Sequence, residues 1–197
     1  MATADGLERG AIDLTGCPGG LHLQATVESG QSYCWNRADD RMYEEPAGPI
    51  PGEAWYHTVV DGEVIRVRQR DGVLEWESTT DAVPTIRELL RLDDDLPAIR
   101  EAAPDDEVVE AAFDRFPGLR LVDDPAFRSL ISFICSAQMR VDRIHENQRR
   151  LARTFGESVT ADGETYHAFP TPEALANTTE ERLRDIGLGY RAPYVLE

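Results

Sequence analysis

Apolar and polar residues alternate along much of the N-terminal part of the chain, which is the period-two pattern of half-buried β-strands. The alternating runs cover residues 55–60, 64–69 and 73–77, and Asp-Gly pairs separate them at residues 61–62 and 71–72. Because Asp-Gly between alternating segments favours tight hairpin turns, we expect an antiparallel meander. Residues 21–27 and 32–35 are predicted as shorter strands, and the Gly-, Pro- and charge-rich residues 37–52 as a loop.

Beyond residue 78 the apolar residues recur every three to four positions, as in amphipathic helices. Proline, aspartate or threonine opens several of these segments, which fits a first helical turn or an N-cap. The predicted helices cover residues 84–92, 96–102, 105–116, 124–134 and 139–155, with short helices starting at Thr171 and Thr179. The apolar stripe of the helix capped by Asp124 consists of Phe127, Leu130, Ile131 and Ile134.

The expected fold class is α+β, with an N-terminal antiparallel β-sheet domain over residues 1–120 and a helical domain over residues 121–197. With 197 residues, 41% of them hydrophobic, the chain is long enough to bury a core. It has no apolar run of membrane-spanning length and no signal-like N-terminus, so we expect a cytoplasmic protein without membrane contact. Cys17, Cys34 and Cys135 lack metal-ligand spacing and are expected to be buried, reduced thiols.

The charge is strongly acidic, with a formal net charge of −17, and all 20 basic residues are arginine because the chain contains no lysine. This composition is expected of a halophile's surface, where a large net charge is tolerated. At molar salt the Debye length is roughly 3 Å, so repulsion between acidic side chains and a nucleic acid is largely screened. The alternative is a protein that avoids nucleic acids.

A candidate functional turn lies at residues 186–195, where the sequence reads IGLGYRAPYV. Gly187 and Gly189 free the backbone for a tight turn, and Tyr190 and Arg191 follow at its tip. A flat ring and a guanidinium at such a tip suit a wedge that separates stacked bases and contacts what remains. From the spacing alone, the alternative is a tyrosine that packs in the core at the start of a helix.

Two further segments give this turn a family context: ESGQSYCW at residues 28–35 and SFICSAQMRVDRI at residues 132–144. In this order and spacing the three segments resemble the 8-oxoguanine DNA glycosylases of the helix-hairpin-helix superfamily, from about Leu14 onward. The resemblance implies a β-rich domain followed by helical domains, and base excision repair of 8-oxoguanine with AP lyase activity. It also implies a monomer that acts on double-stranded DNA containing oxidised guanine, here of a halophilic archaeal type truncated before the helix-hairpin-helix.

The same resemblance assigns a lesion-reading role to Gly30, whose carbonyl would accept the ring hydrogen that 8-oxoguanine carries and guanine lacks. A buried donor or acceptor left unpaired costs about 1–3 kcal/mol, which is enough to separate the two bases. A turn glycine between strands is equally compatible with the local sequence Ser29-Gly30-Gln31.

Four more residues are implied to distort and read the DNA. Gln138 stands at the position where the family has an asparagine that fills the space left by the flipped base, and Tyr190 would wedge beside that base. Arg143 and Arg191 would contact the orphaned cytosine, whose acceptors suit guanidinium donors. Met139 and Arg140 replace two further asparagines of the family pattern, and without the resemblance Arg143 would be an ordinary exposed helix residue.

No catalytic residue is assigned in this chain, because the bifunctional glycosylases use a lysine amine as nucleophile and the chain has none. The nucleophile and its assisting aspartate are expected beyond Glu197, and the chain alone is predicted to be inactive. Its four histidines show no metal spacing and are expected at the surface; we expect no metal and no cofactor. Two rival interpretations are an alkylbase glycosylase of the same superfamily and a non-catalytic DNA-binding remnant.

Overall fold

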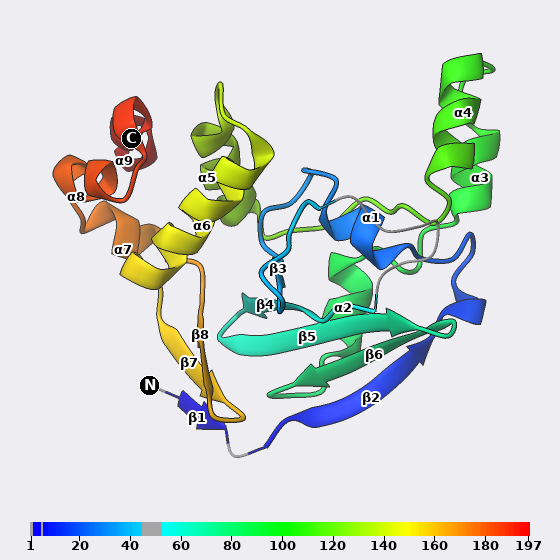
Figure 1. The fold of residues 1–197 in the computed structure, drawn as a ribbon, viewed down its shortest axis with the longest axis horizontal. Helices are drawn as coiled ribbons and strands as arrows, with labels where there is room; N and C mark the ends of the chain where they lie inside the picture. Colours follow the sequence, from blue (N-terminus) through cyan, green and yellow to red (C-terminus); the bar gives the residue numbers. More distant parts are fainter. Residues whose placement is uncertain (1, 5, 45–52) are drawn as a thin grey trace.

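The computed structural model describes residues 2–4, 6–44 and 53–197. Its larger sheet has five antiparallel strands in the order β2-β6-β5-β4-β3 (Figure 1). The strands are β2 (Glu8–Asp13), β3 (Asn36–Arg37), β4 (Tyr56–Val60), β5 (Glu63–Arg70) and β6 (Val73–Ser78). Both Asp-Gly pairs adopt left-handed backbone angles, with φ between 49° and 80°, as a two-residue hairpin turn requires. The predicted meander is confirmed.

Residues 21–27, predicted as a strand, instead contain the short helix α1 (Leu23–Val27). The ring Nδ1 of His22 accepts from the Ala25 amide at 3.1 Å and caps this helix. The side chain of Gln69 on β5 accepts from the Leu23 amide at 2.7 Å and donates to the Leu21 carbonyl at 2.6 Å. This segment therefore bonds to a side chain of the sheet and does not add a strand to it.

Residues 32–35 are likewise not a strand, and only the following two residues, Asn36 and Arg37 of β3, pair with this edge of β4. The predicted loop at residues 37–52 falls partly outside the described residues, at 45–52, and its first residue belongs to β3.

The remaining helices are α2 (Val83–Leu89), α3 (Leu96–Glu101), α4 (Glu107–Arg115), α5 (Ala126–Ser136), α6 (Val141–Phe155), α7 (Pro172–Ala176), α8 (Glu180–Asp185) and α9 (Ala192–Leu196). The helices from α2 to α8 begin close to the predicted positions, whereas α9, which follows the glycine turn, was not predicted. The hydroxyls of Thr171 and Thr179 cap α7 and α8 as predicted. Asp124 does not cap α5, because Pro125 occupies the N-cap position and makes no side-chain bond there.

A second, smaller sheet was not predicted. It contains β1 (Ala2–Ala4), β7 (Ser158–Ala161) and β8 (Glu164–His167), with β1 parallel to β7. The β7–β8 hairpin turns at Asp162 and Gly163, which have φ values of 49° and 77°. Its Asp-Gly pair is the same hairpin signal as in the larger sheet. The strand from the N-terminus thus pairs with a hairpin that follows α6 (Figure 1).

The molecule has two main apolar cores. The first lies between the larger sheet and α1 and α2, and includes Trp35 and Trp76. The second joins α5 to α9 and is formed by Ile131, Cys135, Leu151, Leu175, Leu183, Leu188, Ala192 and Val195. Of the predicted α5 stripe, Ile131 is buried and Phe127 and Ile134 pack against the same core, whereas Leu130 is 57% exposed. Among the described helices, none has the length and apolar character needed to cross a membrane.

Candidate nucleic-acid interface

Two turns that are far apart in the sequence meet at one carbonyl group. The carbonyl oxygen of Ala137, in the turn between α5 and α6, accepts from Arg191 Nε at 3.1 Å and also from Arg191 Nη2. The hydroxyl of Tyr190 donates to the same oxygen at 3.3 Å. The guanidinium carbon of Arg191 lies 4.4 Å from the centre of the Tyr190 ring. The ring and the cation therefore form one unit against the α5–α6 turn.

The turn that carries this pair needs its glycines. Gly187 has φ = 100° and Gly189 has φ = 57°, backbone angles that L side chains rarely adopt. A β-carbon on Gly187 would lie 3.2 Å from Arg150 Nη1, so there is little room for a side chain. The turn leads directly into a short 3₁₀ segment, Gly189–Arg191, followed by α9.

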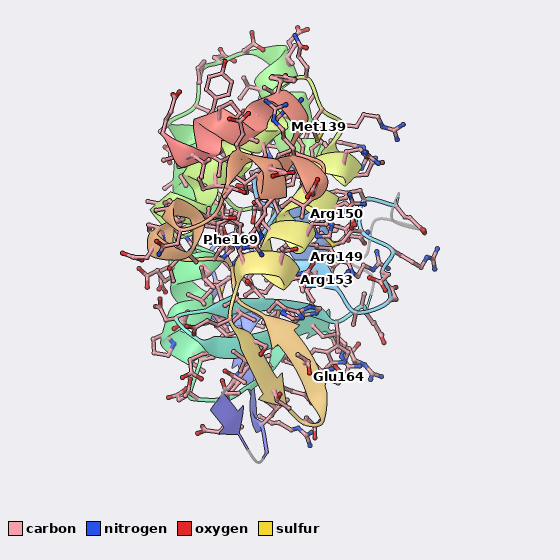
Figure 2. The ribbon with its side chains drawn as sticks, turned by 90° about the vertical axis from the view of Figure 1, so that its left-hand side faces the viewer. Met139, Arg149, Arg150, Arg153, Glu164 and Phe169 are labelled. Atoms are coloured by element: carbon pink, nitrogen blue, oxygen red, sulfur yellow. The ribbon has the colours of Figure 1, made fainter. Side chains whose placement is uncertain are left out.

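Arg150 of helix α6 supports this turn by a hydrogen bond to its backbone. The Nη1 group of Arg150 donates to the Ile186 carbonyl at 3.3 Å, and its Nε donates to Glu146 Oε1 at 2.9 Å. Figure 2 shows Arg150 on α6, between Met139 at one end of the helix and Arg153 toward the other. The contact positions the backbone immediately before Gly187.

The two side chains at the tip differ in exposure. Tyr190 is 53% exposed, whereas Arg191 is only 7% exposed. The expectation that both project from the turn is therefore wrong for Arg191, because its donors are already bound to Ala137. To reach a DNA base, Arg191 would have to exchange this carbonyl for an acceptor on the base.

The α5–α6 turn presents Gln138 in a left-handed conformation, with φ = 54°, and the residue is exposed. Such angles are uncommon outside glycine and are held here by the surrounding structure. The Met139 amide donates to the Ser136 carbonyl at 3.1 Å, and its sulfur accepts from Asn147 Nδ2 at 3.3 Å. Arg140 is 86% exposed and lies 3.3 Å from Asp142.

Gly30 lies beside the start of α6. It has φ = 83°, and a β-carbon there would be 3.8 Å from both the Tyr33 hydroxyl and the Val141 side chain. Arg143 is exposed two residues further along α6. The structure thus gathers Gly30, Gln138, Tyr190 and Arg191 around the α5–α6 turn, with Arg143 on the first turn of the adjoining helix.

His145 ties α6 to the segment that follows Gly30. It is 5% exposed, contrary to the surface position expected for the histidines, and its Nε2 lies 2.9 Å from the Trp35 carbonyl. Burial lowers the pKa of His145, and its neutral ring donates to that carbonyl. Nothing in the local sequence around either residue indicates this contact, because His145 and Trp35 are 110 positions apart.

The cysteines are buried as predicted, and burial raises the pKa of the Cys135 thiol to about 11. Such thiols are poor nucleophiles at neutral pH. Across residues 2–4, 6–44 and 53–197, no cluster of three or more His, Cys, Asp or Glu side chains could hold a metal ion.

Two protein-family models together match residues 17–197. Residues 17–130 match the N-terminal domain of 8-oxoguanine DNA glycosylase. Residues 131–197 match the HhH-GPD superfamily base excision DNA repair protein family. The boundary between the two matches falls inside α5, after Leu130.

Among curated proteins, the chain is similar to an N-glycosylase/DNA lyase of Saccharomyces cerevisiae, with 30% identity over 90% of this chain and 48% of that protein. It is also 33% identical to a probable N-glycosylase/DNA lyase of Methanothermobacter thermautotrophicus, over 91% of this chain and 62% of that protein. The chain therefore spans about half to two thirds of the length of these relatives.

Two solved structures share the fold. MBOgg1 in complex with a low-affinity DNA ligand superposes with a TM-score of 0.80 and 26% identity, over 96% of this chain and 62% of that one. The apo-form of an 8-oxoguanine glycosylase/lyase of Clostridium acetobutylicum gives 0.77 and 20% identity, over 98% and 64%. At 20% identity the second comparison supports the fold alone.

Proposed function

The chain belongs to the 8-oxoguanine DNA glycosylase family, and on this premise we propose that it reads oxidised guanine in double-stranded DNA during base excision repair. The observation that carries the proposal is the junction at the Ala137 carbonyl, where the Tyr190–Arg191 turn is bonded to the turn carrying Gln138. A wedge and a hole-filling side chain must act on adjacent positions of the duplex, and the bonds between the two turns support this pairing.

Tyr190 is the wedge in this proposal. Its ring is exposed, and its position is set by the hydroxyl contact to Ala137 and by the stacked Arg191 guanidinium. An aromatic ring held at its hydroxyl and on one face can enter a base step without first losing much rotational freedom. Gln138 carries both an amide donor and a carbonyl acceptor, so it can bond to the orphaned base once the damaged one is extruded.

Arg191 reads the orphaned cytosine by exchange of partners. In the structure its donors satisfy one carbonyl, and a cytosine edge offers acceptors of the same kind. The exposed Arg143 on the first turn of α6 supplies a second guanidinium. Gly30, beside Val141, supplies the backbone carbonyl that distinguishes 8-oxoguanine from guanine.

The covalent step is outside the chemistry that this chain offers. It contains no lysine, so it has no side-chain amine to attack the sugar and form a Schiff base. We expect borohydride reduction in the presence of 8-oxoguanine duplex to trap no covalent complex. A trapped complex would show that another group of the chain acts as the nucleophile.

The function is tested by binding of duplexes with each of the four bases opposite 8-oxoguanine. Arg191→Ala should weaken binding of the cytosine duplex by about tenfold or more, since one such contact discriminates by roughly 1–3 kcal/mol. The other three duplexes should change little. Tyr190→Ala should reduce base extrusion, followed with a fluorescent base beside the lesion, whichever base lies opposite. Arg115→Ala on α4 serves as a charge-matched control.

Equal weakening of all four duplexes by Arg191→Ala would reduce Arg191 to a phosphate contact and overturn its reading role. Alkylbase excision is the second candidate, because the chain is 29% identical to a DNA-3-methyladenine glycosylase of Bacillus subtilis, over 58% of this chain. A preference of the chain for an alkylated base over 8-oxoguanine would favour this candidate. The match of residues 17–130 to the 8-oxoguanine glycosylase domain favours the first.

A further inference from the structure

A cavity of about 320 Å³ lies where the larger sheet, α6 and the β7–β8 hairpin meet. Its walls include Asn36 of β3, His57 of β4, Gln148 and Arg153 of α6, and His167 of β8. Figure 2 shows Arg149 and Arg153 on α6, with Glu164 below them on the hairpin. The cavity therefore joins the N-terminal sheet to the part of the chain that follows α5.

Unpaired polar atoms gather around this cavity. Among the described residues, ten buried side-chain nitrogen or oxygen atoms have no hydrogen-bond partner, and six of them belong to residues that line it. They are Asn36 Oδ1, Arg37 Nε, Arg128 Nε, both amide atoms of Gln148, and His167 Nδ1. Arg37 Nε lies 2.9 Å from a carboxylate oxygen of Asp39, so the argument depends on the other five. Gln148 is only 3% exposed. Because buried polar groups are normally bonded, their concentration here indicates a polar partner that binds among them.

The charge of the wall is positive in a chain that is otherwise strongly acidic. The Arg128 guanidinium bonds to the Cys34 carbonyl at 2.5 Å and to Thr58 Oγ1 at 3.1 Å, and no carboxylate among the described residues pairs with it. Arg153, which is exposed, has no ion-pair partner among the described residues either. Two guanidinium charges at the cavity are thus left without a counter-charge.

The two carboxylates at the cavity each bond to a neighbour, but only Asp40 pairs with a cation, so the four arginines of the wall leave it a net positive charge. Asp40 lies 3.0 Å from Arg149, and Glu164 accepts from the Tyr166 hydroxyl at 2.8 Å. Burial, followed by the charges of Arg66 and Arg149, lowers the pKa of His57 to about 4. His57 is therefore neutral at pH 7, and a nearby anion would favour its protonated form.

These features define the chemistry of the partner. Two uncompensated guanidinium groups and the Gln148 amide nitrogen are donors that suit negatively charged oxygen. Asn36 Oδ1 and Gln148 Oε1 are acceptors that need a protonated oxygen in return. We propose that the cavity binds a small oxyanion that keeps one hydroxyl, with hydrogen phosphate as its simplest representative.

This site is separate from the proposed DNA-reading site. The reading residues gather at the N-terminal end of α6, whereas Gln148 and Arg153 lie in its second half. At 1.5 Å per residue, Val141 and Arg153 are about 18 Å apart along the helix. Loss of the oxyanion site would leave the reading proposal intact, and the reverse also holds.

The test is calorimetric titration of the 197-residue chain with inorganic phosphate at fixed ionic strength. We expect one phosphate per chain and a rise in melting temperature with phosphate. Arg153→Gln should weaken binding by about tenfold, the effect of losing one hydrogen bond to a charged group. Gln148→Glu should abolish binding by placing a carboxylate in the wall. Arg115→Gln on α4 removes the same charge elsewhere and should bind normally.

A second readout follows the His57 ring by nuclear magnetic resonance, and its pKa should rise when phosphate is added. If Gln148→Glu does not fold, Arg153→Gln and the His57 signal still decide the matter. Absence of binding, or equal weakening in Arg115→Gln, would overturn the proposal. If undamaged duplex DNA competes with phosphate for the unaltered chain but not for Arg153→Gln, the cavity holds a phosphate of the DNA backbone. This outcome would also overturn the proposal.

Discussion

At the scale of single residues, Arg120 shows how a buried charge organises the N-terminal half. It is 1% exposed, and its guanidinium donates to the carbonyls of Gly20 at 2.8 Å, Arg91 at 2.5 Å and Pro18 at 2.8 Å. Its own amide donates to the Thr26 hydroxyl at 3.1 Å. Desolvation lowers the pKa of Arg120, yet the carbonyls surround it with partial negative charge. One side chain thus satisfies acceptors from several separate loops.

We expect Arg120→Met to lower the free energy of unfolding by about 3–5 kcal/mol, because it leaves these carbonyls buried without a donor. Urea denaturation followed by circular dichroism measures the change. Arg115→Gln, an exposed arginine of α4, should change the unfolding free energy by no more than about 0.5 kcal/mol. A small loss in Arg120→Met would mean that water replaces the guanidinium.

His57 makes stability depend on pH. Its pKa is lowered from an ordinary value near 6.5 to about 4 by burial and then by two arginines, so the unfolded chain binds a proton more readily than the folded one. Above pH 6.5 the His57 ring is neutral in both states and does not reduce stability. As the pH falls toward 4, the unfolded chain takes up the proton first and the free energy of unfolding decreases. We expect His57→Gln to remove roughly 2 kcal/mol of this pH-dependent loss, measured by urea denaturation between pH 7 and pH 4. Identical pH profiles would contradict this assignment.

At the scale of elements, α6 connects the parts of the molecule. Its N-terminal end lies beside Gly30, and its C-terminal half both holds the Ile186–Gly187 backbone through Arg150 and lines the oxyanion cavity. Its buried face includes Ile144, His145 and Leu151. The arginines of α6 therefore do not form a uniform solvated surface, since Arg150 bonds to the Ile186 carbonyl.

We expect Arg150→Leu to impair base extrusion more than overall duplex affinity, since it frees the Ile186 carbonyl that precedes the Tyr190 turn. Extrusion is measured with a fluorescent base beside 8-oxoguanine, and affinity by fluorescence anisotropy. Arg184→Leu on α8, which removes a pair with Glu180 on an exposed helix face, is the control. Equal losses of extrusion and affinity would assign Arg150 to phosphate contact.

At the scale of the whole molecule, the net charge of −17 sets the conditions under which the fold is stable. Numerous ion pairs join arginines to carboxylates, but 37 acidic residues face only 20 arginines, so most of the acidic excess repels itself. Salt screens such repulsion over a distance that shortens to roughly 3 Å at molar concentration. We propose that the protein works at high salt.

Unfolding free energy should therefore rise as potassium chloride is increased from dilute to molar concentrations. Thermal unfolding followed by circular dichroism measures the effect, and sucrose serves as a non-ionic control that favours compact states without screening charge. A melting temperature that is independent of salt would rule out the high-salt interpretation.

The sequence by itself determined those features that neighbouring residues decide. The three strands β4 to β6 follow from alternation and Asp-Gly turns, because the turn angles and the facing of side chains are local steric properties. The same local signal, at Asp162 and Gly163, was present for the hairpin that was not predicted. The threonine caps of α7 and α8 likewise involve residues only three positions apart. The segments carrying Gly30, Gln138 and Tyr190 were recognised as local patterns, although their roles in DNA reading stay predictions.

Tertiary structure alone decided what depends on distant partners. Residues 23–27 form a helix beside the sheet. The Gln69 side chain, 46 residues from Leu23, bonds to the Leu23 amide and the Leu21 carbonyl, groups that in a strand would pair with a neighbouring strand. Arg191 is buried because its acceptor is Ala137, 54 residues away. The oxyanion cavity has walls from both sheets and α6, and no local pattern brings Asn36, Gln148 and His167 together. Such contacts depend on how the whole chain packs, which short-range alternation and capping rules do not specify.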